Sequence, residues 1–356
     1  MSMNITFLIG NGFDINLGLA TTYSQFVKSY CKIQDQDSLI IQYFKRHIIK
    51  PNLPLWSNAE LAFGKHTELI PDSFTVEAFC NCHSDFCISL AKYLTQEQKK
   101  LVLNQDNNRI IGESFSKAIN NPTKGFRTVP KNNIQSAISS NTDIVFNFID
   151  FNYTDTLDRI CSTTDIAYGW GKNGHYLNRM GKIIHAHGTV DKDMVLGVHD
   201  ETQIANSACF QAYDEYYLAQ LIKSRTDSIN EENTYQQALH MLNVSDLIYI
   251  YGMSLGETDK FWWEKICGLL KDRKALRVII HSFGAPTGDL LSAERKRHED
   301  AQRNKLFDLG NVNEDQRSAV QSRVHVTGAN IFSELSNITN QPLVKGQSLT
   351  DEIIAV

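Results

Sequence analysis

An apolar run that ends in two closely spaced glycines most strongly limits how this chain can fold. Residues Ile5 to Ile9 form a short apolar stretch, followed directly by Gly10-Asn11-Gly12. A run of this length with a glycine boundary is typical of a buried strand. Thr21 and Thr22 then precede apolar residues at helical spacing, and threonine is a suitable N-cap. The chain is therefore predicted to open with a strand, a glycine loop and a helix.

Strands and helices alternate again after residue 143, where short apolar stretches are separated by segments with helical spacing. Such alternation produces βαβ units and a parallel sheet. We predict an α/β fold of the Rossmann type, with a mostly parallel sheet and helices on both faces. The further predicted strands are Ile144–Phe148, Ile183–Ala186, Met194–Gly197, Ser245–Tyr251, Leu276–Ile280 and Val324–Thr327, with helices at Thr154–Cys161 and Phe261–Leu270.

A long segment between the first and second strands differs from the rest. Residues 32–140 carry apolar side chains at helical spacing and no strong strand pattern. We predict a helical insertion after the first strand and helix. The nucleotide-binding core then comprises residues 1–31 and 141–340, and residues 341–356 form a C-terminal tail.

Charge and cysteine content exclude several classes of protein. The net charge of −5 argues against a nucleic-acid binder, because such domains are usually basic. Seven cysteines in 356 residues are too few for a disulfide scaffold. Neither a secretory signal nor an apolar run long enough to span a membrane is visible. We expect a cytoplasmic protein with reduced thiols and no membrane partner.

The loop after the first strand is a candidate nucleotide-binding loop. Ligands of open parallel sheets bind at the carboxyl ends of the strands. Two glycines in Gly10-Asn11-Gly12-Phe13-Asp14 allow the backbone to expose N–H groups to a phosphate. The loop lacks the third glycine of a complete dinucleotide fingerprint, since Ile15 stands there. A tight turn that requires glycine explains the same residues.

Polar groups also follow the second predicted strand, in Phe151-Asn152-Tyr153-Thr154-Asp155. Asn152, Thr154 and Asp155 supply hydrogen-bond donors and acceptors for a ligand. An ordinary helix start accounts for them equally well, because Thr154 can cap the helix and Asp155 favours its positive end.

Two histidines follow the third predicted strand, in His185-Ala186-His187-Gly188. Residues two apart in a strand face the same side, so both imidazoles can face one cleft. No cysteine or carboxylate completes a metal set at the usual spacing, and we expect no metal. His187 is closer to the strand end and is our candidate general base, since histidine titrates near neutral pH.

The segment Tyr251 to Asp259 contains Gly252-Met253-Ser254-Leu255-Gly256, which matches the G-x-S-x-G elbow of serine hydrolases. Asp289, with His298 or His325, could complete such a triad. A second phosphate- or ribose-binding loop, with Ser254 as a hydrogen-bond donor, is the competing interpretation.

A cluster of Cys80, Cys82, His83 and Cys87 lies in a helical pattern. Its spacing lacks the second cysteine pair of a zinc site. We interpret these residues as buried core side chains.

Six short blocks, in this order, resemble the AbiH family of bacterial phage abortive-infection proteins. They span about residues 4 to 280, and are GNGFDINLGL, WSNAE (Trp56 to Glu60), FNYTDTL, IHAHG, LGVHD (residues 196 to 200) and IYGMSLGETD. The resemblance implies a role in defence against phage, with a phage or defence-system protein as a possible trigger and a homo-oligomer as the expected assembly.

The family in turn resembles a distant branch of the sirtuin-like NAD-binding domains. That resemblance implies a nucleotide site with Gly10 and Gly12, Asn152 and Asp155, His187 and Gly188, and Gly252 and Ser254. Asp259, in the last block, joins the implied nucleotide-binding residues. The paired-CxxC zinc module of sirtuin deacetylases is missing, and one extra residue separates Asn152 from Asp155. Protein deacetylation is therefore not implied.

These resemblances lead us to expect hydrolysis of NAD⁺ to nicotinamide and ADP-ribose, without a metal. Gly10, Gly12 and Ser254 would bind phosphates and ribose, and Asn152 would orient the ribose or the attacking water. His187 would accept a proton. Two alternatives stay open: a module that binds NAD⁺ or a related nucleotide without cleaving it, and the serine hydrolase based on Ser254.

Overall fold

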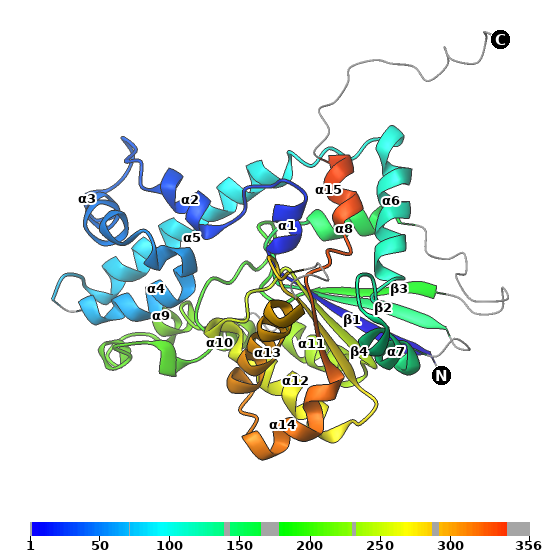
Figure 1. Cartoon of the computed structure of the whole chain (residues 1–356). Helices are drawn as coiled ribbons and strands as arrows, with labels where there is room; N and C mark the ends of the chain where they lie inside the picture. Colours follow the sequence, from blue (N-terminus) through cyan, green and yellow to red (C-terminus); the bar gives the residue numbers. More distant parts are fainter. Residues whose placement is uncertain are drawn as a thin grey trace, which may run out of the picture.

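A six-stranded parallel sheet forms the centre of the molecule (Figure 1). The computed structural model describes residues 2–70, 72–138, 143–164, 178–229, 233–286 and 292–339. The strand order is β3-β2-β1-β4-β5-β6, and each neighbouring pair is parallel. The strands are β1 (Met3–Ile9), β2 (Ile144–Asp150), β3 (Asn178–His185), β4 (Leu247–Tyr251), β5 (Arg277–His281) and β6 (Val324–Thr327).

Helices cover both faces of the sheet, which explains why the central strand β4 is apolar and buried at every position rather than alternating. One face places Phe7 between Phe148 and Tyr249, with ring centroids 5.3 and 5.4 Å apart, under helices α6, α7, α8 and α15. The other face carries Leu8 and Ile250 under α11, α12, α13 and α14. The predicted α/β fold is therefore confirmed.

The helices are α1 (Gly12–Asn16), α2 (Tyr23–Tyr30), α3 (Leu39–Tyr43), α4 (Ala59–His66), α5 (Val76–Gln98), α6 (Gln105–Ile119), α7 (Thr128–Ala137), α8 (Thr156–Ser162), α9 (Glu215–Ala219), α10 (Lys223–Ile229), α11 (Thr234–Asn243), α12 (Lys260–Asp272), α13 (Ser292–Leu309), α14 (Glu314–Val320) and α15 (Ser333–Thr339).

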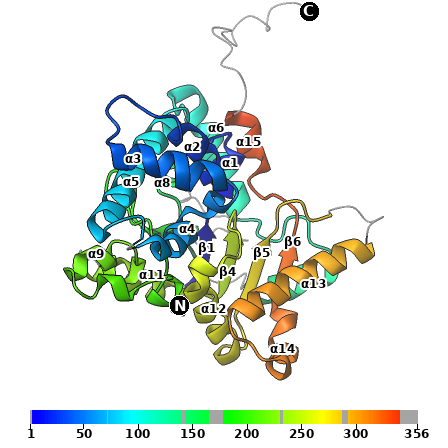
Figure 2. The ribbon, with the colours of Figure 1, turned by 90° about the vertical axis from the view of Figure 1, so that its left-hand side faces the viewer.

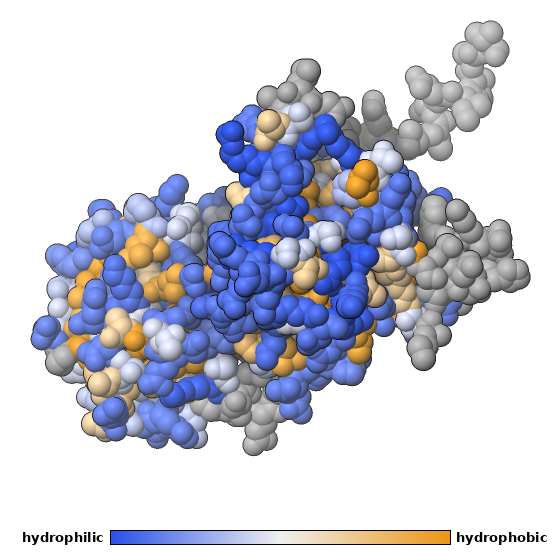
Figure 3. Space-filling model, turned by 60° about the horizontal axis from the view of Figure 1, so that its bottom comes forward, coloured by the Kyte–Doolittle hydropathy of each residue, from blue (hydrophilic) through white to orange (hydrophobic). Residues whose placement is uncertain are grey.

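A second body, which we call the helical lobe, lies beyond the carboxyl ends of the strands (Figure 1, Figure 2). It consists of residues 22–98 together with residues 190–222. Its own apolar core is built around large aromatic side chains, among them Phe44, Trp56, Phe63 and Phe86. On the face seen in Figure 3, hydrophilic side chains dominate and the apolar ones gather mainly over the helical lobe at the left.

The packing divides the predicted insertion into two parts. The helical lobe contains α2 to α5, whereas Ile111, Phe115 and Ile134 of α6 and α7 belong to the core of the sheet. Helix α2 was assigned to the sheet domain by sequence and in fact packs in the helical lobe. Side-chain spacing predicts that a segment is helical but does not say which core its apolar face joins. The predicted tail, residues 341–356, lies outside the described residues.

One predicted strand was wrong. Residues 194–197 have no strand partner and form an irregular segment, flanked by isolated bridges of Thr189 with Lys192 and of Val198 with Ile222. Leu196 and Val198 are buried in the helical lobe, so their apolar character reflects that core rather than the sheet. Among the described residues, no helix is long and apolar enough to cross a membrane.

The loops after β1 and β4 touch through their glycines. A Cβ atom on Gly12 would lie 2.5 Å from the Cα atom of Gly252. Gly252 itself has a φ of +69°, and a Cβ there would lie 2.8 Å from the Gly10 oxygen and from the Phe13 nitrogen. Both the space and the backbone conformation therefore require glycine at position 252.

We predict that Gly252→Ala lowers the free energy of unfolding by at least about 1–3 kcal/mol, because alanine is strained at positive φ and lacks space here. Gly268 in α12 is the matched control, since a Cβ there meets nothing within 4 Å. Gly268→Ala should stabilise by up to about 1 kcal/mol. Urea denaturation measures both, and equal midpoints for wild type and Gly252→Ala would contradict the packing argument.

Candidate functional site

A polar pocket of about 440 Å³ lies between the sheet and the helical lobe. The loops after β1, β2, β3 and β4 supply one wall, and α2, α4 and α5 supply the other. The lining residues are Gly10, Asn11, Asp14, Thr21, Thr22, Tyr23, Ser57, Asn58, Glu60, Leu90, Leu94, Phe151, Asn152, Tyr153, Thr154, His187, Lys223, Gly252, Met253, Ser254, Thr258 and Asp259. The volume suits a small-molecule ligand.

The pocket opens at the point where the strand order reverses. The chain moves from β1 outward to β2 and β3, then returns to place β4 on the other side of β1. The loops on both sides of this switch point, which begin at Gly10 and Gly252, reach the pocket. In open α/β sheets the crevice at this position is where ligands bind.

Lys223 occupies the centre of a buried ionic network at one end of the pocket. Its Nζ atom lies 2.9 Å from Oε2 of Glu60, 3.5 Å from Oδ1 of Asp259 and 3.1 Å from Nε2 of His187. Burial lowers the pKa of Lys223, but the two carboxylates outweigh that effect and raise it. Lys223 therefore stays charged in an almost fully buried position.

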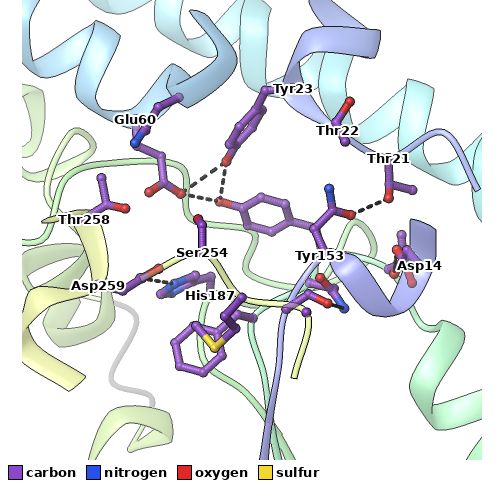
Figure 4. Close-up of a pocket in the computed structure, with 18 of the residues that line it drawn as sticks. Asp14, Thr21, Thr22, Tyr23, Glu60, Tyr153, His187, Ser254, Thr258 and Asp259 are labelled. Atoms are coloured by element: carbon purple, nitrogen blue, oxygen red, sulfur yellow. Dashed lines mark hydrogen bonds and ion pairs between the residues drawn. The ribbon is translucent and has the colours of Figure 1, made fainter. Parts of the chain in front are cut away.

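Two tyrosines orient Glu60 from the opposite side. The hydroxyls of Tyr23 and Tyr153 each donate to Oε1 of Glu60 over 3.2 Å. Burial and the neighbouring Glu60 raise the pKa of both tyrosines well above the ordinary value, so both remain donors. Figure 4 shows Glu60, Asp259 and His187 on one side of the Tyr153 ring, with Asp14 and Thr21 on the other.

His187 contacts Asp259 and Phe151 in addition to Lys223. Nε2 of His187 lies 3.4 Å from Oδ1 of Asp259, and the ring edge meets the ring of Phe151. Burial raises the pKa of Asp259, but Lys223 and His187 outweigh burial and lower it to about 2.

Asp14 lies at the other end of the pocket, where hydrogen bonds within the protein hold its carboxylate. It is fully buried, and its carboxylate accepts hydrogen bonds from the hydroxyls of Thr154, over 2.7 Å, and Thr156. Burial raises the pKa of Asp14 to about 6, although the threonine hydrogen bonds oppose the shift. These bonds tie α1 to the segment that carries Asn152 and Tyr153.

Asn152 lines the pocket, and the nitrogen of its side-chain amide is already hydrogen-bonded within the protein. Its side-chain nitrogen donates to the Gly10 oxygen over 3.3 Å, and its backbone N–H donates to Asp150. The carboxamide oxygen has no partner among the described residues and is the group left for a ligand. Asn11 similarly accepts a hydrogen bond from the Thr21 hydroxyl.

The backbone hydrogen bonds of the first loop argue against the phosphate binding predicted for it. The N–H of Gly12 donates to the Gly252 oxygen over 2.8 Å, and that of Phe13 donates to the Gly10 oxygen over 2.9 Å. Gly12 and Phe13 do not line the pocket, and the Phe13 ring packs against Phe332 in the core. Here the two glycines serve close packing of two loops.

Asp155 also lies apart from this pocket. It lines a second cavity, with Asp158 and His185, and its carboxylate is 3.8 Å from Arg159. The other predicted site residues meet in the first pocket: Gly10, Asn11, Asp14, Asn152, His187, Gly252, Ser254 and Asp259.

The proposed serine-hydrolase triad does not assemble among the described residues. Ser254 is exposed at the pocket, whereas His298 is bonded to Ser282 over 2.7 Å and His325 to Asn133 over 3.1 Å. Asp289 lies outside the described residues. The cysteine cluster also serves packing: Cys80 and Cys82 are buried in the helical lobe, and His83 bonds the Leu196 oxygen over 2.8 Å.

Sequence reasoning missed Glu60, Lys223, Tyr23 and Tyr153 as site residues. Glu60 is the last residue of the WSNAE block, so the family resemblance included this residue but did not indicate what it does. Lys223 follows an irregular segment and is brought to the pocket by the fold of residues 190–222, which no local pattern indicates.

The chain was also compared with known proteins. A family model described as "Bacteriophage abortive infection AbiH" matches residues 6–281, a range that includes every residue lining the pocket. No curated protein and no solved structure matches the chain.

We predict that Lys223→Met lowers the free energy of unfolding by about 3–5 kcal/mol, because it leaves two buried carboxylates without their cation. The Glu60→Gln/Lys223→Met double variant should lose less than the sum of the two single variants, since one stranded charge is then removed. Chemical denaturation of all four proteins measures this coupling. Additive losses would show that the network is not energetically connected.

We predict that ionisation of Asp14 lowers the free energy of unfolding as the pH rises. A carboxyl whose pKa is raised from 3.8 to about 6 favours folding fully below its unfolded pKa, and this contribution disappears as the pH passes the folded pKa. Relative to Asp14→Asn, the wild type should therefore lose up to about 3 kcal/mol of unfolding free energy between pH 4 and pH 7. A difference between the two proteins that stays constant over this range, in urea titrations, would contradict the assignment.

Proposed function

The chain belongs to the AbiH family of bacteriophage abortive-infection proteins, and on that premise we propose that its pocket binds NAD⁺ and hydrolyses the nicotinamide–ribose bond. The position of the pocket carries the proposal. It opens at the switch point of a sheet with the order β3-β2-β1-β4-β5-β6. Sheets of this order bind dinucleotides across that crevice.

The chemistry of the bond suits the side chains present. Nicotinamide is a cation while attached to ribose and leaves as a neutral molecule with the electron pair of the broken bond. The transition state at the ribose carbon has oxocarbenium character, as in other glycosidic cleavage. Negative charge near the ribose stabilises it, and the carboxylates of Glu60 and Asp259 supply that charge at one end of the pocket.

His187 receives the proton in this scheme. Water attacks the ribose carbon, its oxygen forms the new bond, and one of its protons passes to His187. The imidazolium is then held by Asp259, 3.4 Å away.

Asn152 and Ser254 would bind the ribose and phosphates. Asn152 offers its carboxamide oxygen as an acceptor for a ribose hydroxyl, and Ser254 offers an exposed hydroxyl at the pocket rim. The backbone of Gly12 and Phe13 would not contact phosphates, because both N–H groups are bonded within the protein. Asp14, with both oxygens bonded to threonines, would hold the loop rather than the nucleotide.

Consumption of NAD⁺ would arrest an infected cell, which suits abortive infection. Constant activity would harm the host, so we propose that a phage or defence-system protein triggers it and that the chain self-associates. The helical lobe forms one wall of the pocket and is the part through which a trigger could act.

We predict that the purified protein converts NAD⁺ to nicotinamide and ADP-ribose, and that His187→Ala lowers turnover by about a hundredfold or more, the usual contribution of a general base. His187→Gln, which keeps an acceptor for Lys223 but does not take up a proton at neutral pH, should lose similar activity. Chromatography of the products measures both, and His240→Ala, an exposed histidine on α11, is the control.

Unchanged turnover in the His187 variants would refute its role. Tight NAD⁺ binding by calorimetry, with no turnover in vitro and no fall in total NAD⁺ in infected cells, would instead establish a nucleotide-binding sensor.

A further inference from the structure

We propose that Asp150, Asp158 and His185 form a binding site for a divalent transition-metal cation beside the second cavity. The inference does not depend on the nucleotide chemistry proposed above, because it concerns other side chains and another cavity.

Neighbouring strands bring two of the three ligands together. Asp150 ends β2 and His185 ends β3, and the two residues are direct partners across the parallel pair. Asp158 comes from the first turn of α8, which follows β2. One ligand atom from each of the three side chains lies within 4.8 Å of the others. Oδ2 of Asp158 is 2.8 Å from Nε2 of His185, and Oδ2 of Asp150 is 3.8 Å from Nδ1 of His185.

Two polar atoms of this group are buried and make no hydrogen bond. They are Oδ2 of Asp150 and Nδ1 of His185. Asp150 is fully buried, and its other oxygen accepts the backbone N–H of Asn152. A buried acceptor without a partner is unfavourable, and more so when it is charged. A cation beside Asp150 would supply the partner that this buried Oδ2 atom lacks.

The second cavity gives such a cation access. Its volume is about 510 Å³, and Asp158 and His185 line it. The Asp158 side chain is 43% exposed, whereas that of His185 is 18% exposed. The imidazole of His185 and the half-exposed carboxylate of Asp158 therefore face a cavity with room for water as further ligands, and the buried carboxylate of Asp150 lies next to His185, outside the cavity lining.

The donor set selects the class of metal. Two carboxylates and one imidazole suit Mn²⁺, Fe²⁺ or Zn²⁺. Mg²⁺ and Ca²⁺ prefer oxygen ligands alone and fit less well. Spacing along the chain does not bring any carboxylate near His185, which is why no metal set was expected there. The two aspartates lie 35 and 27 positions away in sequence and reach His185 only through the sheet and α8.

A cation here would also fix the first pocket. His185 precedes His187 by two residues, and Asp150 precedes Asn152 by two. His187 and Lys223 line both cavities and form part of the wall between them. Tying the ends of β2 and β3 together would hold the loops that carry Asn152 and His187.

Titration of the metal-free protein with Mn²⁺, followed by the electron paramagnetic resonance signal of free Mn²⁺, tests the site. We expect one saturable Mn²⁺ per chain, displaced by Zn²⁺. Asp158→Asn should weaken binding by at least about tenfold, because even outer-shell changes cost 10–100-fold in metal affinity. An amide can still bond His185 there, so this variant should fold. His185→Ala should abolish saturable binding.

Asp193→Asn is the matched control, since Asp193 lines the same cavity and loses the same charge but is not in the ligand set. Its Mn²⁺ affinity should equal that of the wild type. The proposal is overturned if the wild type shows no saturable binding of Mn²⁺ or Zn²⁺. It is also overturned if Asp158→Asn and His185→Ala bind as the wild type does, which would indicate an adventitious ion elsewhere.

Discussion

The ion pair between Lys223 and Glu60 is the interaction on which the rest of the site depends. Glu60 belongs to the helical lobe, and Lys223 begins α10 at the end of the segment that returns from that lobe. Asp259 and His187 join the same network from the loops after β4 and β3. One buried ammonium thus connects both walls of the pocket. Burial of such charges is costly unless each is paired, so the network also fixes how the two walls meet.

Two carboxylates of the pocket have pKa values shifted in opposite directions, although burial raises the pKa of both, because only one of them has a cation beside it. Asp259 has a cation and an imidazole beside it and a pKa lowered to about 2, whereas Asp14 has only hydroxyl partners and a pKa raised to about 6. The ionised group stands beside His187, where a proton would be received. The group that resists ionisation anchors α1 to the loop with Asn152. Rigid packing of Gly10, Gly12 and Gly252 holds the loops around both ends.

The sequence was sufficient for the fold and for those site residues that follow strands. A fully buried strand is apolar at every position and is easily recognised, and polar residues directly after it must meet at one edge of a parallel sheet. Gly10, Asn152, His187 and Gly252 were found in this way. Spacing cannot show what reaches that edge from elsewhere, which is why Glu60 and Lys223 were missed. Nor can it separate glycines that cradle a ligand from glycines that pack two loops together, as Gly12 and Gly252 do.

A structure of the His187→Gln variant with NAD⁺ bound tests the central claim most directly, because it locates the dinucleotide while hydrolysis is blocked. The account predicts that NAD⁺ lies across the switch point between β1 and β4, with the ribose that carries nicotinamide facing residue 187 and near Asn152. NAD⁺ bound elsewhere, or in this pocket with that ribose turned away from residue 187, would contradict it.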